Sequence, residues 1–164
     1  MKHLIIQLVA IYLTSITLSS CSSMEDVALQ NPYISNLENT GCQSHWDTDN
    51  AESRSEVNNS TFEMIFEEKV AQCKFISLEY PCDYGQVNVK ITYNEGIMII
   101  IEYPSSDKAD CRCEIDASFT IENMPKNDLI LKIYHGDTQG NYDSASPKYE
   151  GLINKTDCKI LIPY

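Results

Sequence analysis

The chain has 164 residues, with 12 basic and 24 acidic side chains and a formal net charge of −12 at pH 7. An anionic chain without a basic stripe repels phosphate backbones and anionic head groups, so nucleic acid is not an expected partner. The length allows one modest hydrophobic core.

The first 20 residues have the pattern of a signal peptide. A short basic start, Met1–His3, precedes a nearly continuous apolar run from Leu4 to Leu18, which is too short to span a bilayer comfortably. Leu18-Ser19-Ser20-Cys21 resembles the lipobox of bacterial lipoproteins, whose cysteine is acylated, for example with palmitate, and becomes the new N-terminus. We therefore expect a signal peptide over residues 1–20 and lipid on Cys21. The alternative is an ordinary cleaved signal next to which Cys21 stands by chance.

The residues after Cys21 predict where in the cell envelope the protein is located. Ser22 is not the aspartate associated with inner-membrane retention, which favours the outer membrane. Glu25 and Asp26 resemble the export signal of Bacteroidetes-type surface lipoproteins, which implies display at the cell surface; alternatively, they begin a solvated tether. Without residues 1–20 the chain would keep 11 basic and 24 acidic side chains, a net charge of −13.

Residues 21–60 are rich in Ser, Asn, Asp, Glu and Thr, with only scattered apolar side chains. This composition predicts a mobile lipidated tether and polar arm. Cys42 and Trp46 are the exceptions, because a disulfide and a large ring would pin the arm to the body.

Residues 61–164 are predicted to form an all-β domain, since short β-rich runs alternate with turn residues and no helical period appears. Residues 86–93 and 113–121 alternate apolar and polar side chains, as half-buried strands do. Asn94-Glu95-Gly96 is typical of a hairpin loop. About seven strands favour an antiparallel immunoglobulin-like β-sandwich, with a small barrel as the alternative. The predicted runs are 62–67, 73–80, 86–93, 96–103, 113–121, 129–134 and 158–162.

Six cysteines remain beside Cys21, and an even number outside the cytoplasm indicates disulfides. They are Cys42, Cys73, Cys82, Cys111, Cys113 and Cys158. We expect Cys82 to bond to Cys111 or Cys113, with Cys42 taking the other member, because an adjacent pair such as Cys111–Cys113 would be strained. The alternative is a zinc site built from Cys42, His45, Cys111 and Cys113.

One segment supports a family-level resemblance. Tyr80-Pro81-Cys82, Val87–Ile91, Gly96–Glu102 and the C-x-C-x-x-D segment from Cys111 to Asp116 resemble uncharacterised Bacteroidetes-type lipoproteins with a small cysteine-bearing β-domain. The likeness covers residues 41 to 134 and brings no catalytic residues. Cys73 and Cys158 are additional to that pattern, which implies that they pair with each other.

Catalytic and metal sites have little support in the sequence. Only His45 and His135 remain after signal removal, no G-x-S-x-G motif occurs, and His135 is predicted to be a surface loop residue. Glycosidase chemistry needs two convergent carboxylates, and abundant pairs such as Glu67-Glu68 make coincidence the favoured explanation. Two acidic loops offer oxygen ligands for calcium but lack EF-hand spacing, so solvated loops are favoured. They contain Asp47, Asp49 and Glu52, and Asp137, Asn141 and Asp143.

Aromatic residues near loops are the candidates for ligand binding, because their rings can stack on sugars. They are Trp46, Tyr134, Tyr142 and Tyr149. The alternative is that these tyrosines fill the edges of the sandwich.

The prediction is therefore a lipid-anchored envelope protein whose loops bind a glycan or a protein, with no enzymatic activity, cofactor or metal. The alternatives are a structural partner of a larger outer-membrane complex and, least favoured, a small envelope hydrolase.

Overall fold

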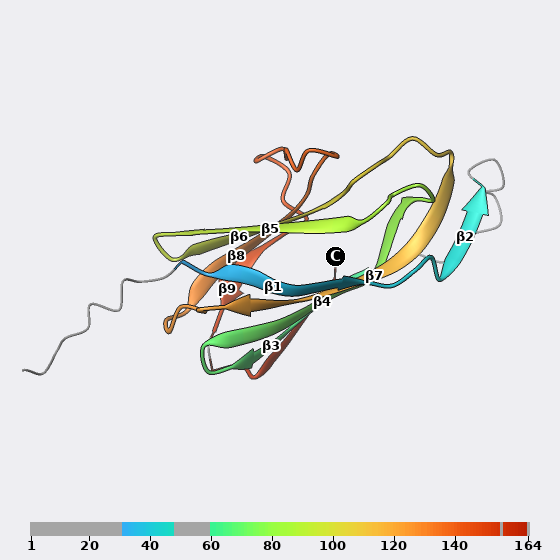
Figure 1. Cartoon of the computed structure of the whole chain (residues 1–164). Helices are drawn as coiled ribbons and strands as arrows, with labels where there is room; N and C mark the ends of the chain where they lie inside the picture. The colour runs from blue at the N-terminus through green and yellow to red at the C-terminus, as the bar shows by residue number, and fades with distance from the viewer. Residues whose placement is uncertain (1–30, 48–59, 155, 164) are drawn as a thin grey trace, which may run out of the picture. The chain divides into compact units, whose positions relative to one another are not determined.

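A computed structural model describes residues 31–47, 60–154 and 156–163, with backbone alone for 44–47. All ten elements of this described part are strands, and they form two sheets (Figure 1). Sheet A has the order β1 (Tyr33–Asn39), β7 (Cys111–Glu122), β4 (Val70–Pro81), β3 (Thr61–Glu67) and β10 (Lys159–Pro163), and β2 (Ser44–Asp47) also pairs with β7. Sheet B has the order β5 (Val87–Asn94), β6 (Ile97–Pro104), β8 (Leu129–His135) and β9 (Tyr149–Ile153).

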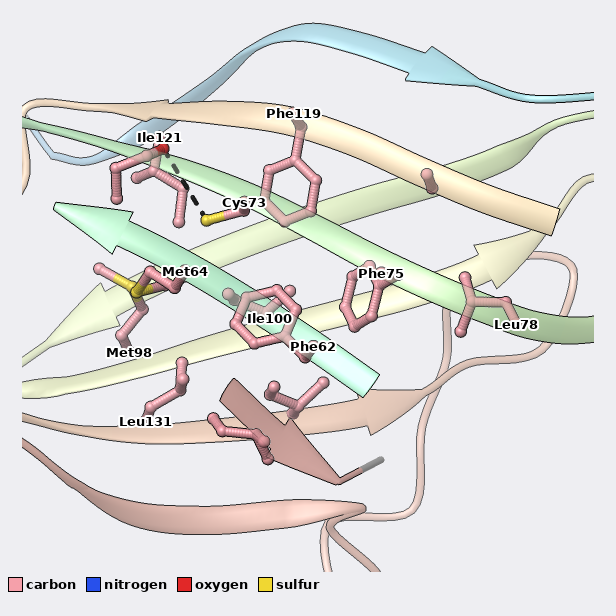
Figure 2. Packing of buried hydrophobic residues seen from close by; sticks show 14 of the residues in the cluster. Phe62, Met64, Cys73, Phe75, Leu78, Met98, Ile100, Phe119, Ile121 and Leu131 are labelled. Carbon is pink, nitrogen blue, oxygen red and sulfur yellow. Dashed lines mark hydrogen bonds between the residues drawn. The ribbon is translucent and has the colours of Figure 1, made fainter. Parts of the chain in front are cut away.

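The two sheets enclose one apolar core, which confirms the predicted all-β sandwich. Phe62, Phe75 and Phe119 of sheet A are fully or almost fully buried and face Ile100 and Leu131 of sheet B (Figure 2). The Phe62 and Phe75 ring centroids lie 4.7 Å apart, within the range of favourable aromatic pairs. Alternate residues of each strand supply these side chains, as the period of two predicts.

Pairing within the sheets is antiparallel with one exception. Strands β6 and β8 run parallel, with Ile97 opposite Ile130 and Glu102 opposite His135. This corrects the expectation of a wholly antiparallel sandwich, and the immunoglobulin-like strand order stays a prediction. The parallel pair brings the ends of β6 and β8 to the same end of the molecule, as two parallel neighbours must.

The predicted hairpin between residues 93 and 97 is confirmed. Asn94 pairs with Ile97, so Glu95 and Gly96 form a two-residue loop. Both have positive φ, 49° and 82°, as the type I′ turn of a tight hairpin requires. A glycine is therefore well placed at position 96.

The boundary expected at residue 60 is wrong, because two strands lie within the predicted arm. Strand β1 pairs with β7 from Tyr33 to Asn39, and β2 pairs with the first residues of β7. Between these strands, the Thr40 N–H donates to the Asp116 carbonyl at 2.9 Å. The sandwich therefore includes residues 33–47. The predicted signal peptide, Cys21 and the first part of the predicted tether lie outside the described residues.

Two of the predicted disulfides are present. Cys42 bonds to Cys113 and Cys82 bonds to Cys111, and the Cα atoms of each pair lie 5.5 Å apart. The Cys42 bridge ties the former arm to β7, as expected. The four cysteines are disulfide-bonded, so the thiolates that the alternative zinc site needs are absent.

The expected Cys73–Cys158 bond is wrong, since both cysteines are free. Cys73 is buried in the middle of β4, whereas Cys158 is exposed just before β10, and β3 lies between these two strands. Two strand spacings amount to about 10 Å, beyond the separation of about 7 Å that a disulfide can bridge. The Cys73 thiol instead donates to the Ala71 carbonyl at 3.8 Å (Figure 2), and burial raises its pKa.

Candidate functional site

A cleft of about 610 Å³ opens at the end of the sandwich where β4 ends and β7 begins. We call it the end cleft. Its wall comes from the end of β4, the segment after β6, the start of β7 and the loop after β8, which is the orange-red loop in Figure 1. The lining residues are 79–81, 104, 107, 112, 135–137 and 141–143. Residues that are far apart in the sequence therefore meet in one hollow.

A buried carboxylate holds the histidine of the end cleft. Glu102 is fully buried, and its Oε1 lies 2.8 Å from Nδ1 of His135, whose side chain is 46% exposed. Glu102 belongs to the same set of alternate, buried β6 residues as Met98 and Ile100. The fold therefore places a carboxylate on the apolar face of this strand. This contact fixes the orientation of the imidazole and leaves Nε2 as its other nitrogen.

Tyr80 forms part of the same wall. Its ring centroid lies 5.5 Å from that of His135, and the residue is 2% exposed. Its hydroxyl has no hydrogen-bond partner within the described part of the chain. A buried hydroxyl without a partner carries an energetic cost, which a ligand or a water molecule reaching it would relieve.

The loop after β8 is held in shape by Asp137. Its Oδ1 accepts hydrogen bonds from the Gln139 and Asn141 N–H groups, both at 2.9 Å, and its Oδ2 accepts one from Asn141 Nδ2. The hydrogen bonds from Asn141 and Gln139 lower the pKa of Asp137, so the carboxylate stays charged at neutral pH. The same loop requires Gly140, which has a φ of 74° and lies against Lys90.

The end cleft has an excess of negative charge. Glu79, Asp107, Asp137 and Asp143 line it, whereas Arg112 is the only lysine or arginine among the described lining residues. A hollow lined by charges of one sign focuses their electric field and attracts ligands of the opposite charge.

The aromatic candidates occupy different environments. Tyr142 is 37% exposed and lines the end cleft, but Tyr134, with which it makes a ring contact at 4.5 Å, is buried. Tyr149 is half-buried and packs against the core, in agreement with the edge-filling alternative for this residue. The Trp46 side chain lies outside the described part. The structure therefore brings one aromatic candidate, Tyr142, to the cleft.

The predicted acidic loops do not gather into a metal site where they are described. Within those residues no group of three or more His, Cys, Asp or Glu side chains is placed to hold a metal ion. In the second loop, Asp137 binds N–H groups of its own loop, and Asp143 accepts a hydrogen bond from the Ala145 N–H. Asp49 and Glu52 lie outside the described residues.

Sequence reasoning missed Glu102, Tyr80 and the contact of His135 with Glu102. His135 is exposed and lies at a strand end, as predicted, but it is the last residue of β8 rather than a loop residue, and its Nδ1 contacts a buried carboxylate. The sequence did contain a signal for Glu102, because an acidic residue at an alternate position that otherwise carries apolar side chains must find a partner when it is buried. The partner itself depends on the parallel pairing of β6 with β8, which no local pattern specifies.

A second hollow of about 460 Å³ lies against β1, β3, β4 and β7. Several of its polar side chains already have partners, since Thr120 donates to Gln72 at 3.0 Å and Lys74 pairs with Asp116, which lies outside the lining. The end cleft is therefore the stronger candidate.

The described residues contain no helix long and apolar enough to cross a membrane. No family model matches the chain, and neither the curated proteins nor the solved structures gave a match.

Proposed function

We propose that this chain is a lipid-anchored protein of the outer membrane, displayed at the cell surface, that binds a glycan or a protein without chemical turnover. The lipobox-like segment ending at Cys21 supports the anchor. The end cleft supports the binding activity and is the observation that carries the proposal, because small ligands and side chains of partners bind in concave sites with a few fixed polar groups.

The composition of the cleft favours binding over covalent catalysis. Among the described lining residues there is no serine, threonine or cysteine beside His135 that it could activate as a nucleophile. The groups present are instead those that orient a ligand: a fixed imidazole, a half-exposed tyrosine ring and a rigid loop.

The test is a glycan array combined with a pull-down from envelope extracts, using the full-length chain purified in detergent. Tyr142→Ala should reduce binding to any ligand that is found. Tyr33→Ala removes a tyrosine that is 52% exposed on β1 and does not line the cleft, so it should leave binding unchanged. Reproducible absence of binding in both assays, or an equal loss of binding in the two variants, would contradict binding in the end cleft.

A second candidate function is assembly into a larger envelope complex. Strand β9 is one edge strand of sheet B and β10 is one edge strand of sheet A, and they expose Leu152 and Leu161 by 63% and 59%. Edge strands with exposed apolar residues are used for strand addition between proteins. Crosslinking in intact cells from cysteines placed on β9 would give discrete partners if this function operates, and none if it does not.

A further inference from the structure

The end cleft selects against anionic ligands. It is lined by four carboxylates, those of Glu79, Asp107, Asp137 and Asp143, and by one guanidinium, that of Arg112, while Lys90 outside the lining binds the loop that carries Asp137. Nδ1 of His135 lies 2.8 Å from Oε1 of the buried Glu102. A ligand bearing phosphate, sulfate or carboxylate would meet net repulsion here, and a cation would relieve the repulsion between the carboxylates.

Two uncharged groups of the wall can accept hydrogen bonds. In the neutral imidazole, Nδ1–H donates to Glu102, so Nε2 carries the lone pair. The Tyr80 hydroxyl is buried and has no partner among the described residues, and its oxygen can accept a hydrogen bond as well as donate one. Together with the carboxylates, these atoms favour a ligand that brings several donors to one place.

Tyr142 adds a surface suited to a cation. Its ring lies 4.5 Å from the buried ring of Tyr134, which supports it from behind, while 37% of the residue stays exposed. A cation within about 6 Å of such a ring is attracted by its negative face.

We propose that the end cleft binds its ligand through a primary ammonium group, and this proposal rests on the binding function proposed above. An ammonium has one positive charge, three N–H donors and no acceptor, so it complements the carboxylates, Nε2 of His135 and the ring of Tyr142. A lysine side chain of a peptide and the amine of a glucosamine unit both provide this chemistry.

The experiment compares matched ligands that differ in one acetyl group. The full-length chain in detergent, labelled with ¹⁵N, is titrated with an N-acetylated hexapeptide containing one lysine and with its acetyl-lysine counterpart. A second pair consists of glucosamine tetramer and N-acetylglucosamine tetramer. We expect amide signals of residues 135–143 to shift with an amine form and to stay unchanged with the acetylated form. The pair that responds identifies the source of the amine.

Two variants locate the effect. Glu79→Gln removes a cleft carboxylate and should weaken binding of the amine about two- to fivefold. Glu67→Gln removes the same charge from the exposed hairpin of β3 and β4, outside the cleft, and should leave binding unchanged.

The outcomes separate this proposal from the broader one. If acetylated forms bind as well as the amines, the ammonium proposal is overturned and ligand binding in the cleft stands. If no ligand of either pair shifts the signals, the ammonium proposal is also overturned, and the glycan array and pull-down decide the broader function. Equal weakening by Glu79→Gln and Glu67→Gln would show general charge attraction and would overturn the proposed site.

Discussion

Asp116 illustrates how one residue joins three parts of the sandwich. Its Oδ1 accepts a hydrogen bond from the Ser77 N–H at 3.0 Å, and its Oδ2 lies 2.7 Å from Lys74 Nζ. Ser77 has a positive φ of 56° at the point where the pairing of β4 with β7 shifts register. The backbone of Asp116 also binds Thr40. The aspartate of the C-x-C-x-x-D segment therefore stabilises a β-bulge and the connection between β1 and β2.

This residue should make stability depend on pH. Partial burial would raise the pKa of Asp116, but the Lys74 ammonium and the Ser77 N–H outweigh it, so the pKa is lowered. A lowered folded pKa adds stability above the unfolded value of about 3.9, and this stability is lost as the pH falls through the folded value. We expect Asp116→Asn to lower the free energy of unfolding by about 1 kcal/mol at pH 7 and to lose less stability than the wild type below pH 4.

Urea unfolding between pH 2.5 and 7 measures both effects. Asp157→Asn, which changes an exposed aspartate outside both sheets, is the control and should follow the wild-type curve. An Asp116→Asn curve parallel to that of the wild type would show that this carboxylate does not contribute.

The Glu102–His135 pair allows a double-mutant cycle. His135→Ala removes a donor 2.8 Å from a buried carboxylate and should lower the free energy of unfolding by about 1–2 kcal/mol. In a Glu102→Gln background the buried group is neutral, so the same change should cost less. Equal costs in the two backgrounds, measured by urea unfolding at pH 7, would mean that the two side chains are not coupled.

At the scale of elements, both disulfides fasten the first residues of β7. The Cys42–Cys113 bond closes a sequence separation of 71 residues, and the Cys82–Cys111 bond closes one of 29. The chain-entropy relation gives upper values of about 4.4 and 3.6 kcal/mol for the two loops. We therefore expect the Cys42→Ser/Cys113→Ser variant to be less stable than Cys82→Ser/Cys111→Ser. Thermal and urea unfolding of the two pairs would test this, and the reverse order would contradict the dominance of loop closure.

β-rich runs between turn residues predicted seven of the ten described strands, and two of these runs, residues 86–93 and 113–121, show the period of two of half-buried strands. The four-residue strand β2 was missed. The prediction also missed β1, where Asn36 has a positive φ of 52° and a register shift between Ser35 and Glu38 interrupts the period. It also missed β9, a five-residue strand interrupted by Gly151, over which the ring of Tyr149 lies.

The candidate site was less predictable than the strands for a related reason. The alternation of side chains along a strand tells which face a residue occupies, but it does not tell which strands are neighbours. This explains why Cys73 and Cys158 were wrongly paired and why His135 was not joined to Glu102. Both errors concern strand order. The Cys82 and Cys42 bonds were predicted because they depended on the face of a strand and on loop position instead.

At the scale of the whole molecule, the proposal joins an N-terminal anchor to a binding cleft in the sandwich. Cys21→Ser removes the proposed acylation site, so we expect the variant to lose its acyl mass and its membrane association, or to accumulate as the precursor. Intact-mass analysis and membrane fractionation of both forms measure this. Cys158→Ser, an exposed free thiol, serves as the matched control. Unchanged fractionation together with a wild-type mass lacking acyl groups would contradict the anchor.

Ligand binding in the end cleft is the central claim, and photo-crosslinking tests it most directly. A photoreactive phenylalanine analogue is placed at Tyr142 in the full-length chain, or at Tyr33 as the control, and intact cells are irradiated. Both tyrosines are partly exposed, but Tyr142 alone of the two lines the cleft. The account predicts a discrete adduct from position 142 that is absent from position 33. No adduct at position 142, or the same adducts from both positions, would contradict it.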